Sequence, residues 1–229
     1  MDILDHTPNF SAEAALEILQ SNYAITGELK PLPSERDQNF RVIANSGEQY
    51  VLKIANGLEN PGFLNAQHKA WGQLVGKVDF CPQLISTIGG KPSITVDKVG
   101  ITVDNHSVSV ENGRTSSPKD RTSSGHVVQL VTWLEGVPLA DVGRQTDGLM
   151  RDLGHKLGQM DAALAGFDHP AAHRKFHWDL AHGLEVVAEK RHLINEPEVG
   201  ELVDNIVTGF ETRVVPILPK LRQSVIHND

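Results

Sequence analysis

The stretch YVLKIAN, residues 50–56, decides the fold, because it is an apolar run broken by a single cation, Lys53. A short apolar run rich in β-branched and aromatic residues is typical of a strand. Since side chains alternate across a strand, we expect Lys53 to face away from the packed side that holds Leu52 and Ile54. Lys53 is then either a solvent-facing strand lysine or a cationic donor that binds nucleotide phosphates. The spacing leaves both interpretations open.

The residues on either side of this stretch predict a small sheet packed with at least one helix. Ser46-Gly47 is a hairpin-type turn, Ser11 is a helix N-cap and Pro61 begins a second helix. Strands are predicted at residues 24–32, 40–45 and 48–55, and helices at 11–23 and 61–77.

The second half of the chain predicts mostly helix. Short alternating runs at 93–103 and 106–110 precede ENGRTSSPKDRTSSG, a polar segment expected to form an exposed, mobile loop. A strand is predicted at 126–134, and helices at 147–166, 170–190 and 197–213. This order indicates an α+β fold with two lobes. We place the N-terminal lobe at 1–135, with the polar insert 111–125 and the linker strand 126–135, and the helical C-terminal lobe at 136–229.

Composition excludes several classes of protein. The 229 residues hold 39% apolar residues, enough for a buried core, and 21 basic against 29 acidic residues give a net charge of −8. A negative field repels phosphate backbones, so we expect no nucleic-acid partner, although a local basic site for a nucleotide remains compatible. The single cysteine, Cys81, rules out an internal disulfide or a Cys-based zinc site. Residues 1–10 lack the pattern of a signal peptide and no apolar run is long enough to span a bilayer, so we expect a cytoplasmic protein without a membrane partner.

Two further segments carry candidate chemistry. Ser34–Phe40 is a polar turn without glycine between two predicted strands, and such a turn presents donors suited to phosphate. His227-Asn228-Asp229 follows the apolar pair Val225-Ile226, and a carboxylate just past a buried strand is well placed to act as a base. An ordinary polar tail is the alternative, and it is favoured when this segment is considered alone.

Three histidines raise the question of a metal site. His169, His173 and His177 recur every four residues on one predicted helix, which places imidazoles on one face. The HExxH arrangement of zinc proteases is absent, and exposed helix histidines are much commoner, so we favour the interpretation without metal. The sequence also lacks a Walker A loop, a dinucleotide fingerprint and a GxSxG elbow.

Six segments occur together in one order: LPSERDQNFRV (32–42), YVLKIAN (50–56), NAQHKAWGQL (65–74), VVQLVTWLEGVPL (127–139), LGQMDAALAGFDHPA (157–171) and VIHND (225–229). Taken together, these segments resemble the aminoglycoside phosphotransferase family, a branch of the kinase-like fold. The SERDQNF turn and the GFDHPA…WDL stretch look most like hydroxylysine kinases and like phosphotransferase domains fused to class III aminotransferases.

The resemblance implies a protein-kinase-like fold with a sheet-rich N-lobe and an incomplete helical C-lobe. It implies an ATP-dependent phosphotransferase, with GTP as an alternative donor and Mg²⁺ as cofactor, acting on a hydroxyl of a small amino alcohol such as hydroxylysine. Lys53 is similar to the lysine that contacts the α- and β-phosphates, and Asp229 to the catalytic aspartate, with His227 positioning its loop. Ser34 and Asn39 belong to the loop that covers the nucleotide, and Thr132, Trp133 and Leu134 to the linker that bonds adenine.

Two departures from the family pattern matter. The helix glutamate that pairs with the kinase lysine is matched here by Gln67. The metal-binding asparagine and aspartate of the family follow the catalytic aspartate, so we expect the metal ligands beyond Asp229 and none in this chain. We therefore interpret the chain as a fragment or truncated product with little activity of its own, with C-terminal fusion to further domains as one arrangement. The alternatives are a non-catalytic kinase-like or regulatory module of a larger fusion enzyme, and an aminoglycoside phosphotransferase.

Overall fold

A computed structural model describes residues 6–97, 125–175 and 179–226. The chain forms two compact units, Met1–Met150 and Arg151–Asp229. The functional boundary that the sequence places at residue 135 stays a prediction. Most of the predicted insert 111–125, and the alternating run 106–110, lie outside the described residues.

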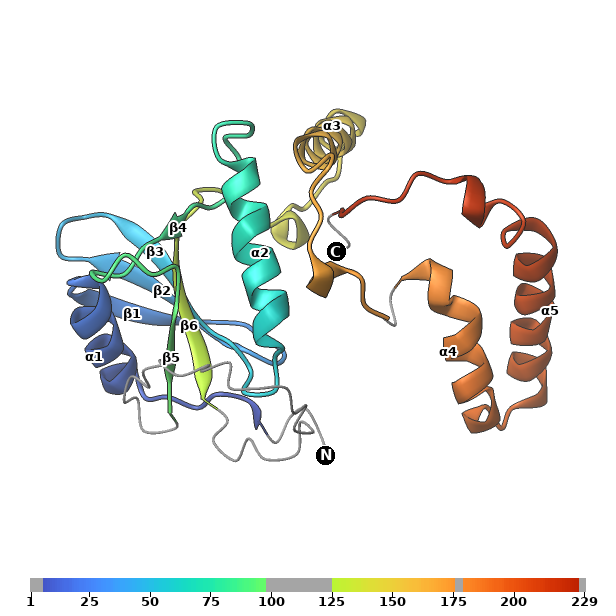
Figure 1. The fold of residues 1–229 in the computed structure, drawn as a ribbon, viewed down its shortest axis with the longest axis horizontal. Coiled ribbons are helices and arrows are strands. Elements are labelled where there is room, and N and C mark those ends of the chain that lie inside the picture. Colours follow the sequence, from blue (N-terminus) through green and yellow to red (C-terminus); the bar gives the residue numbers. More distant parts are fainter. Residues whose placement is uncertain (1–5, 98–124, 176–178, 227–229) are drawn as a thin grey trace, which may run out of the picture. The chain divides into compact units, whose positions relative to one another are not determined.

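The first unit is built on an antiparallel sheet (Figure 1). Its strands lie in the order β1-β2-β3-β6-β4, and β5 also pairs with β6, beside β4. The strands are β1 (Gly27–Leu32), β2 (Gln38–Ala44), β3 (Gln49–Ile54), β4 (Leu84–Ile85), β5 (Ile94–Val96) and β6 (His126–Thr132). The strand predicted at 126–134 is β6, which ends at Thr132 and lies inside the sheet, between β3 and the short strands β4 and β5.

The β2–β3 hairpin sets the register of the predicted site. Its turn closes with hydrogen bonds from Gly47 N–H to the Ala44 carbonyl and from Ala44 N–H to the Glu48 carbonyl. Gly47 has a φ of 93°, a conformation that favours glycine, which explains the Ser46-Gly47 turn. The hairpin brings Asn39 opposite Lys53.

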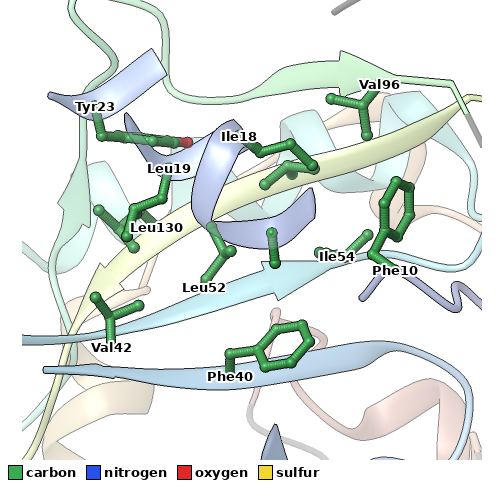
Figure 2. Close-up of a cluster of buried hydrophobic side chains, with 12 residues drawn as sticks. Phe10, Ile18, Leu19, Tyr23, Phe40, Val42, Leu52, Ile54, Val96 and Leu130 are labelled. Atoms are coloured by element: carbon green, nitrogen blue, oxygen red, sulfur yellow. The ribbon is translucent and has the colours of Figure 1, made fainter. Parts of the chain in front are cut away.

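Helix α1 (Ala12–Tyr23) covers one face of the sheet and forms the core there (Figure 2). Ser11 caps the helix, as predicted, by accepting a hydrogen bond from Ala14 N–H. The strands contribute alternate residues to this core, which is why their apolar positions repeat with a period of two. The core consists of Phe10, Ala15, Ile18, Leu19, Tyr23, Phe40, Val42, Leu52, Ile54, Val96, Val128 and Leu130.

Helix α2 (Pro61–Leu74) lies on the other side of the sheet (Figure 1). Asn60 caps it by accepting from the N–H groups of Gly62 and Phe63, and Pro61 takes the first helical position. The helix ends three residues before the predicted end at 77, because Gly76 adopts a left-handed φ of 74°.

Two strand predictions needed correction. The strand predicted at 24–32 begins only at Gly27, because Ala24, with a φ of 56°, closes helix α1 in the left-handed conformation. Strand β4 was not predicted, since a strand of two residues shows no periodicity in the sequence.

Helices dominate the rest of the chain. Helix α3 spans Asp147–Ala163 and α5 spans Pro197–Arg213, close to the predicted ranges. The predicted continuous helix 170–190 is wrong: a 3₁₀ turn at Pro170–Ala172 and another at Leu180–His182 precede α4 (Gly183–Lys190). Two separate caps explain the interruption, because His169 accepts from Ala171 N–H and Asp179 accepts from Ala181 N–H. Each cap starts a new helical turn instead of continuing one helix.

The last described residues are not the buried strand that the sequence suggested. Residues 222–226 have no regular structure, and Ile226 is 51% exposed. Leu221 is also exposed, so the apolar run 214–221 contributes little buried surface. Within the described residues, no helix is both long and apolar enough to cross a membrane.

Candidate functional site

A polar row crosses the sheet on the face opposite the α1 core. Asn39 of β2 pairs with Lys53 of β3, and Lys53 pairs with Gln129 of β6. Their chain neighbours Phe40, Leu52 and Leu130 point to the α1 core. Because successive side chains alternate, these three polar side chains share the α2 face of the sheet.

Lys53 lies at the centre of this row, half-buried between the fully buried Leu52 and Ile54. The prediction that Lys53 faces away from its apolar neighbours is confirmed. Among the described residues, none forms an ion pair or hydrogen bond with its ammonium group. The cation is therefore held on a central strand without a carboxylate partner in that part of the chain.

Asn39 lies beside Lys53 with an incomplete set of hydrogen bonds. Its side-chain Oδ1 is buried and bonds to no group in the described ranges. A buried polar atom without a partner costs about 1–3 kcal/mol, so such a group favours a bound ligand that completes its bonding. Asn39 and Lys53, both predicted site residues, are thus brought together by the hairpin.

Helix α2 reaches the row through His68 and not through Gln67. His68 Nε2 lies 2.7 Å from Oε1 of Gln129, which accepts the hydrogen bond from the imidazole. Gln129 is only 5% exposed. Gln67, the position matched to the kinase glutamate, is exposed on α2. Where the family pattern expects a lysine–glutamate pair, the structure has a hydrogen bond between His68 and Gln129, one residue along α2.

The polar turn predicted at 34–40 divides into an exposed connection and the start of a strand. Residues 33–37 link β1 to β2, and Ser34 is exposed in that connection, whereas Gln38, Asn39 and Phe40 belong to β2. The connection is fixed at its base: Asp37 Oδ1 accepts from Asn56 N–H at 3.0 Å, and the Asn56 amide donates to the Arg36 carbonyl at 3.3 Å. The exposed turn is therefore tied to Asn56, just after the end of β3, the strand that carries Lys53.

The predicted linker residues lie at the end of β6: Thr132 is its last residue, and Trp133 and Leu134 follow it. Thr132 N–H donates to the Gln83 carbonyl, and Trp133 N–H donates to the Gln49 carbonyl. Both N–H groups are thus engaged within the protein. Leu134 is 46% exposed, and its N–H bonds to no described residue.

A second polar cluster holds the linker against the sheet. Arg41 donates to Gln49 Oε1, and its guanidinium lies 4.2 Å from the ring centroid of Trp133. Gln49 in turn donates to Glu135 Oε1 at 3.2 Å. The indole Nε1 of Trp133 is buried and bonds to no group in the described part of the chain. Three segments of the first unit therefore meet at Trp133.

The predicted catalytic residues His227 and Asp229 lie outside the described residues. Within the described ranges no three His, Cys, Asp or Glu side chains are grouped in a way that would hold a metal ion. His169 caps a 3₁₀ turn and His173 bonds to Asp168, so these two do not lie on a common helix as predicted. His177 is outside the described residues.

Four residues of this site escaped sequence reasoning. Gln129 offered a signal, because it is a polar residue inside the apolar strand VVQLV. Asn56 lies in the quoted stretch YVLKIAN, directly after the strand. His68 and Arg41 carried no signal of their own, since exposed histidines and strand arginines are common.

Comparisons with known proteins agree with this architecture. The model of the family described as phosphotransferase enzyme family matches residues 28–229. The chain is 24% identical over 236 residues to a hydroxylysine kinase of Danio rerio, covering 100% of the chain and 61% of the relative. It is 27% identical over 238 residues to a hydroxylysine kinase of Xenopus laevis, covering 98% of the chain and 58% of the relative. The chain thus spans about 60% of the length of the curated relatives that it matches.

Two solved structures share the fold. An amicoumacin kinase, solved in complex with AMP-PNP and Ca²⁺, aligns with a TM-score of 0.59 at 13% identity, covering 94% of this chain and 55% of its own. A microcompartment-associated aminopropanol kinase aligns with a TM-score of 0.50 at 15% identity, covering 75% of this chain and 46% of its own. At these identities the likeness concerns the fold alone, and the predicted kinase-like α+β fold is confirmed.

Proposed function

The chain belongs to the phosphotransferase enzyme family, and we propose that its protein transfers the γ-phosphoryl group of ATP to a hydroxyl of a small amino alcohol. The observation that carries this proposal is Lys53, held on a central strand, turned away from the core and without a described carboxylate partner. Such a fixed ammonium group is suited to phosphate oxygens. The hydroxylysine kinases among the relatives support 5-hydroxylysine as the first acceptor to test.

The nucleotide would lie along the α2 face of the sheet, with its phosphates at Lys53 and its base at the linker. Thr132 follows Gln129 by three residues, a separation of about 10 Å along a strand. The N–H of Leu134 is the linker donor that remains for adenine, since those of Thr132 and Trp133 are engaged. Ser34, in the exposed turn 33–37, would cover the phosphates.

Catalysis in this family of reactions depends on positioning and on charge stabilisation more than on covalent chemistry. Asp229 would accept or orient the acceptor hydroxyl, and His227 would hold its loop, as the resemblance implies. Mg²⁺, when bound, neutralises charge on the β- and γ-phosphates, and the resemblance places its ligands after Asp229. GTP is the alternative donor.

Two other functions would give different results in an assay of phosphoryl transfer. A non-catalytic kinase-like module would bind ATP without turnover. An aminoglycoside phosphotransferase would need a broad acidic surface for a polycation, and the net charge of −8 is compatible with one.

The acceptor is tested with the whole gene product that contains these 229 residues. The protein is incubated with ATP and Mg²⁺, and kcat/KM is compared for 5-hydroxylysine, aminopropanol and kanamycin. We expect 5-hydroxylysine to have the highest kcat/KM. A value for kanamycin far above that for hydroxylysine would refute the amino-acid acceptor, and nucleotide binding without any transfer would favour the non-catalytic module.

The role of Asp229 is tested in the same protein. Asp229→Asn should lower kcat far more than it raises the Kd for ATP, because the carboxylate acts on the acceptor hydroxyl in the chemical step. A variant with near-normal kcat would show that Asp229 does not have this role.

A further inference from the structure

Helix α2 contains no acidic residue from Pro61 to Leu74. It therefore has no carboxylate to pair with Lys53, although kinases depend on a lysine–glutamate pair between the strand and this helix. From α2, His68 reaches the polar row through its 2.7 Å hydrogen bond to Gln129.

The His68 ring is held from two sides. Besides the bond to Gln129, it stacks on Trp71 one turn further along α2, with ring centroids 6.3 Å apart and an angle of 17° between the planes. A ring fixed by stacking and by a hydrogen bond has little freedom to rotate. The donor direction at Nε2 is therefore set by the helix itself.

Gln129 connects the fixed His68 ring to strand β3. It is 5% exposed and lies directly opposite Lys53 in the antiparallel β3–β6 ladder. Directly opposed side chains have Cβ atoms about 4.5–5.5 Å apart, close enough to restrict one another's rotamers. Because a buried amide must keep its hydrogen bonds, the bond from His68 selects one orientation of Gln129 beside Lys53.

We propose that His68 and Gln129 are positioning residues for Lys53, a hydrogen-bonded pair without a carboxylate that stands in place of the helix glutamate. The inference rests on the proposed nucleotide site. The pair fixes the direction of the lysine side chain without neutralising its charge, so that the full cation is left for the phosphates. His68 then affects the binding of the phosphates and leaves the binding of the base unchanged.

Comparing ATP with adenosine separates this role from a general structural one. His68→Ala should weaken ATP binding to the 229-residue chain about threefold to tenfold, the range that corresponds to one net hydrogen bond. Adenosine, which lacks phosphates, should bind the variant as it binds the wild type. His68→Gln, which keeps a donor to Gln129, should restore most of the ATP affinity. The Kd values are measured by isothermal titration, and melting temperatures establish that each variant is folded.

Gln67→Ala is the matched control, because Gln67 is the exposed neighbour on the same helix. Gln67→Ala should change the Kd of neither ATP nor adenosine. Equal losses of ATP and adenosine affinity in His68→Ala, or a loss in Gln67→Ala as large as in His68→Ala, would overturn the inference.

Lys53→Ala distinguishes failure of the inference from failure of the proposed function. If Lys53→Ala weakens ATP binding while His68→Ala and His68→Gln bind like the wild type, the positioning role is wrong and the nucleotide site stands. If Lys53→Ala also leaves ATP binding unchanged, both proposals are wrong.

Discussion

Arg41 lies over the indole ring of Trp133, with its guanidinium carbon 4.2 Å from the ring centroid. The same guanidinium donates to Gln49, whose own amide donates to Glu135. One side chain on β2 thus connects β3 with the linker that follows β6. A cation–π contact of this kind is worth about 0.5–2 kcal/mol, depending on how far it is desolvated.

Arg41→Ala should loosen the linker and weaken ATP and adenosine binding by a similar factor, because Trp133 and Leu134 lie where the base is proposed to bind. Arg41→Lys should be nearly as impaired, since an ammonium group neither stacks on the indole as a plane nor donates as a fork. The change is measured by isothermal titration and by the emission of Trp133, identified with Trp133→Phe.

Arg144→Ala is the control for this series, because Arg144 is exposed and makes no cation–π contact with a described residue. Loss of ATP affinity with unchanged adenosine affinity in Arg41→Ala would contradict a role at the base, because that pattern is expected of a residue at the phosphates.

Asn56 fixes the turn between β1 and β2. Asn56 is 4% exposed. Asn56→Ala removes two side-chain hydrogen bonds, one donated to the Arg36 carbonyl and one accepted from Leu58 N–H. In urea, the free energy of unfolding should fall by about 1–3 kcal/mol, the cost of leaving buried partners unsatisfied. Trypsin should also cut faster after Arg36.

The matched control is Asn195→Ala, because the exposed Asn195 amide donates at 3.5 Å to the Leu193 carbonyl and to no other described group. Asn56→Asp should be at least as damaging as alanine, because it loses the donor and places a carboxylate beside Asp37. Unchanged stability and unchanged cleavage in both Asn56 variants would show that Asn56 does not anchor the turn.

Two glycine substitutions with opposite expected signs test the packing of the first unit. A Cβ on Gly27 would lie 2.1 Å from the Ile43 carbonyl oxygen. Gly27→Ala should therefore force the β1 backbone away from β2 and lower the free energy of unfolding by about 1–3 kcal/mol or more. A Cβ on Gly72 would meet nothing within 4 Å, and Gly72→Ala should stabilise α2 by about 0.5–1 kcal/mol. Both variants lower the entropy of the unfolded chain equally, so the difference reports on the folded state. Equal effects in urea unfolding would contradict the β1–β2 register.

The correct predictions rest on patterns within short stretches of the sequence. The alternation around Lys53 indicated its face correctly, because a strand buried on one side must repeat with period two. The helix at 197–213 was predicted with its observed bounds, since Pro197 marks its first turn. The continuous helix 170–190 was wrong, because the caps formed by His169 and Asp179 each begin a separate turn.

The pairing of His68 with Gln129 could not be predicted from the sequence. A shift of one residue rotates a side chain by about 100° around a helix, which separates the exposed Gln67 from the sheet-facing His68. Matching α2 to the family pattern cannot place a side chain to within one residue, because the match carries no information on the distance between α2 and β6. The register that brings Gln129 opposite Lys53 likewise depends on a strand far away in the chain.

Lys53 is proposed to bind the phosphates of a nucleotide on the α2 face of the sheet. The most direct test is the Kd of ATP and of adenosine for the wild-type 229-residue chain and for Lys53→Ala, measured by isothermal titration. Lys53→Ala should weaken ATP binding at least tenfold and leave adenosine binding unchanged, and Lys53→Arg should not restore the ATP affinity, because a planar fork does not replace a compact ammonium. An ATP affinity that is the same in wild type and Lys53→Ala, or a wild-type chain that binds neither ligand, would contradict phosphate binding by Lys53.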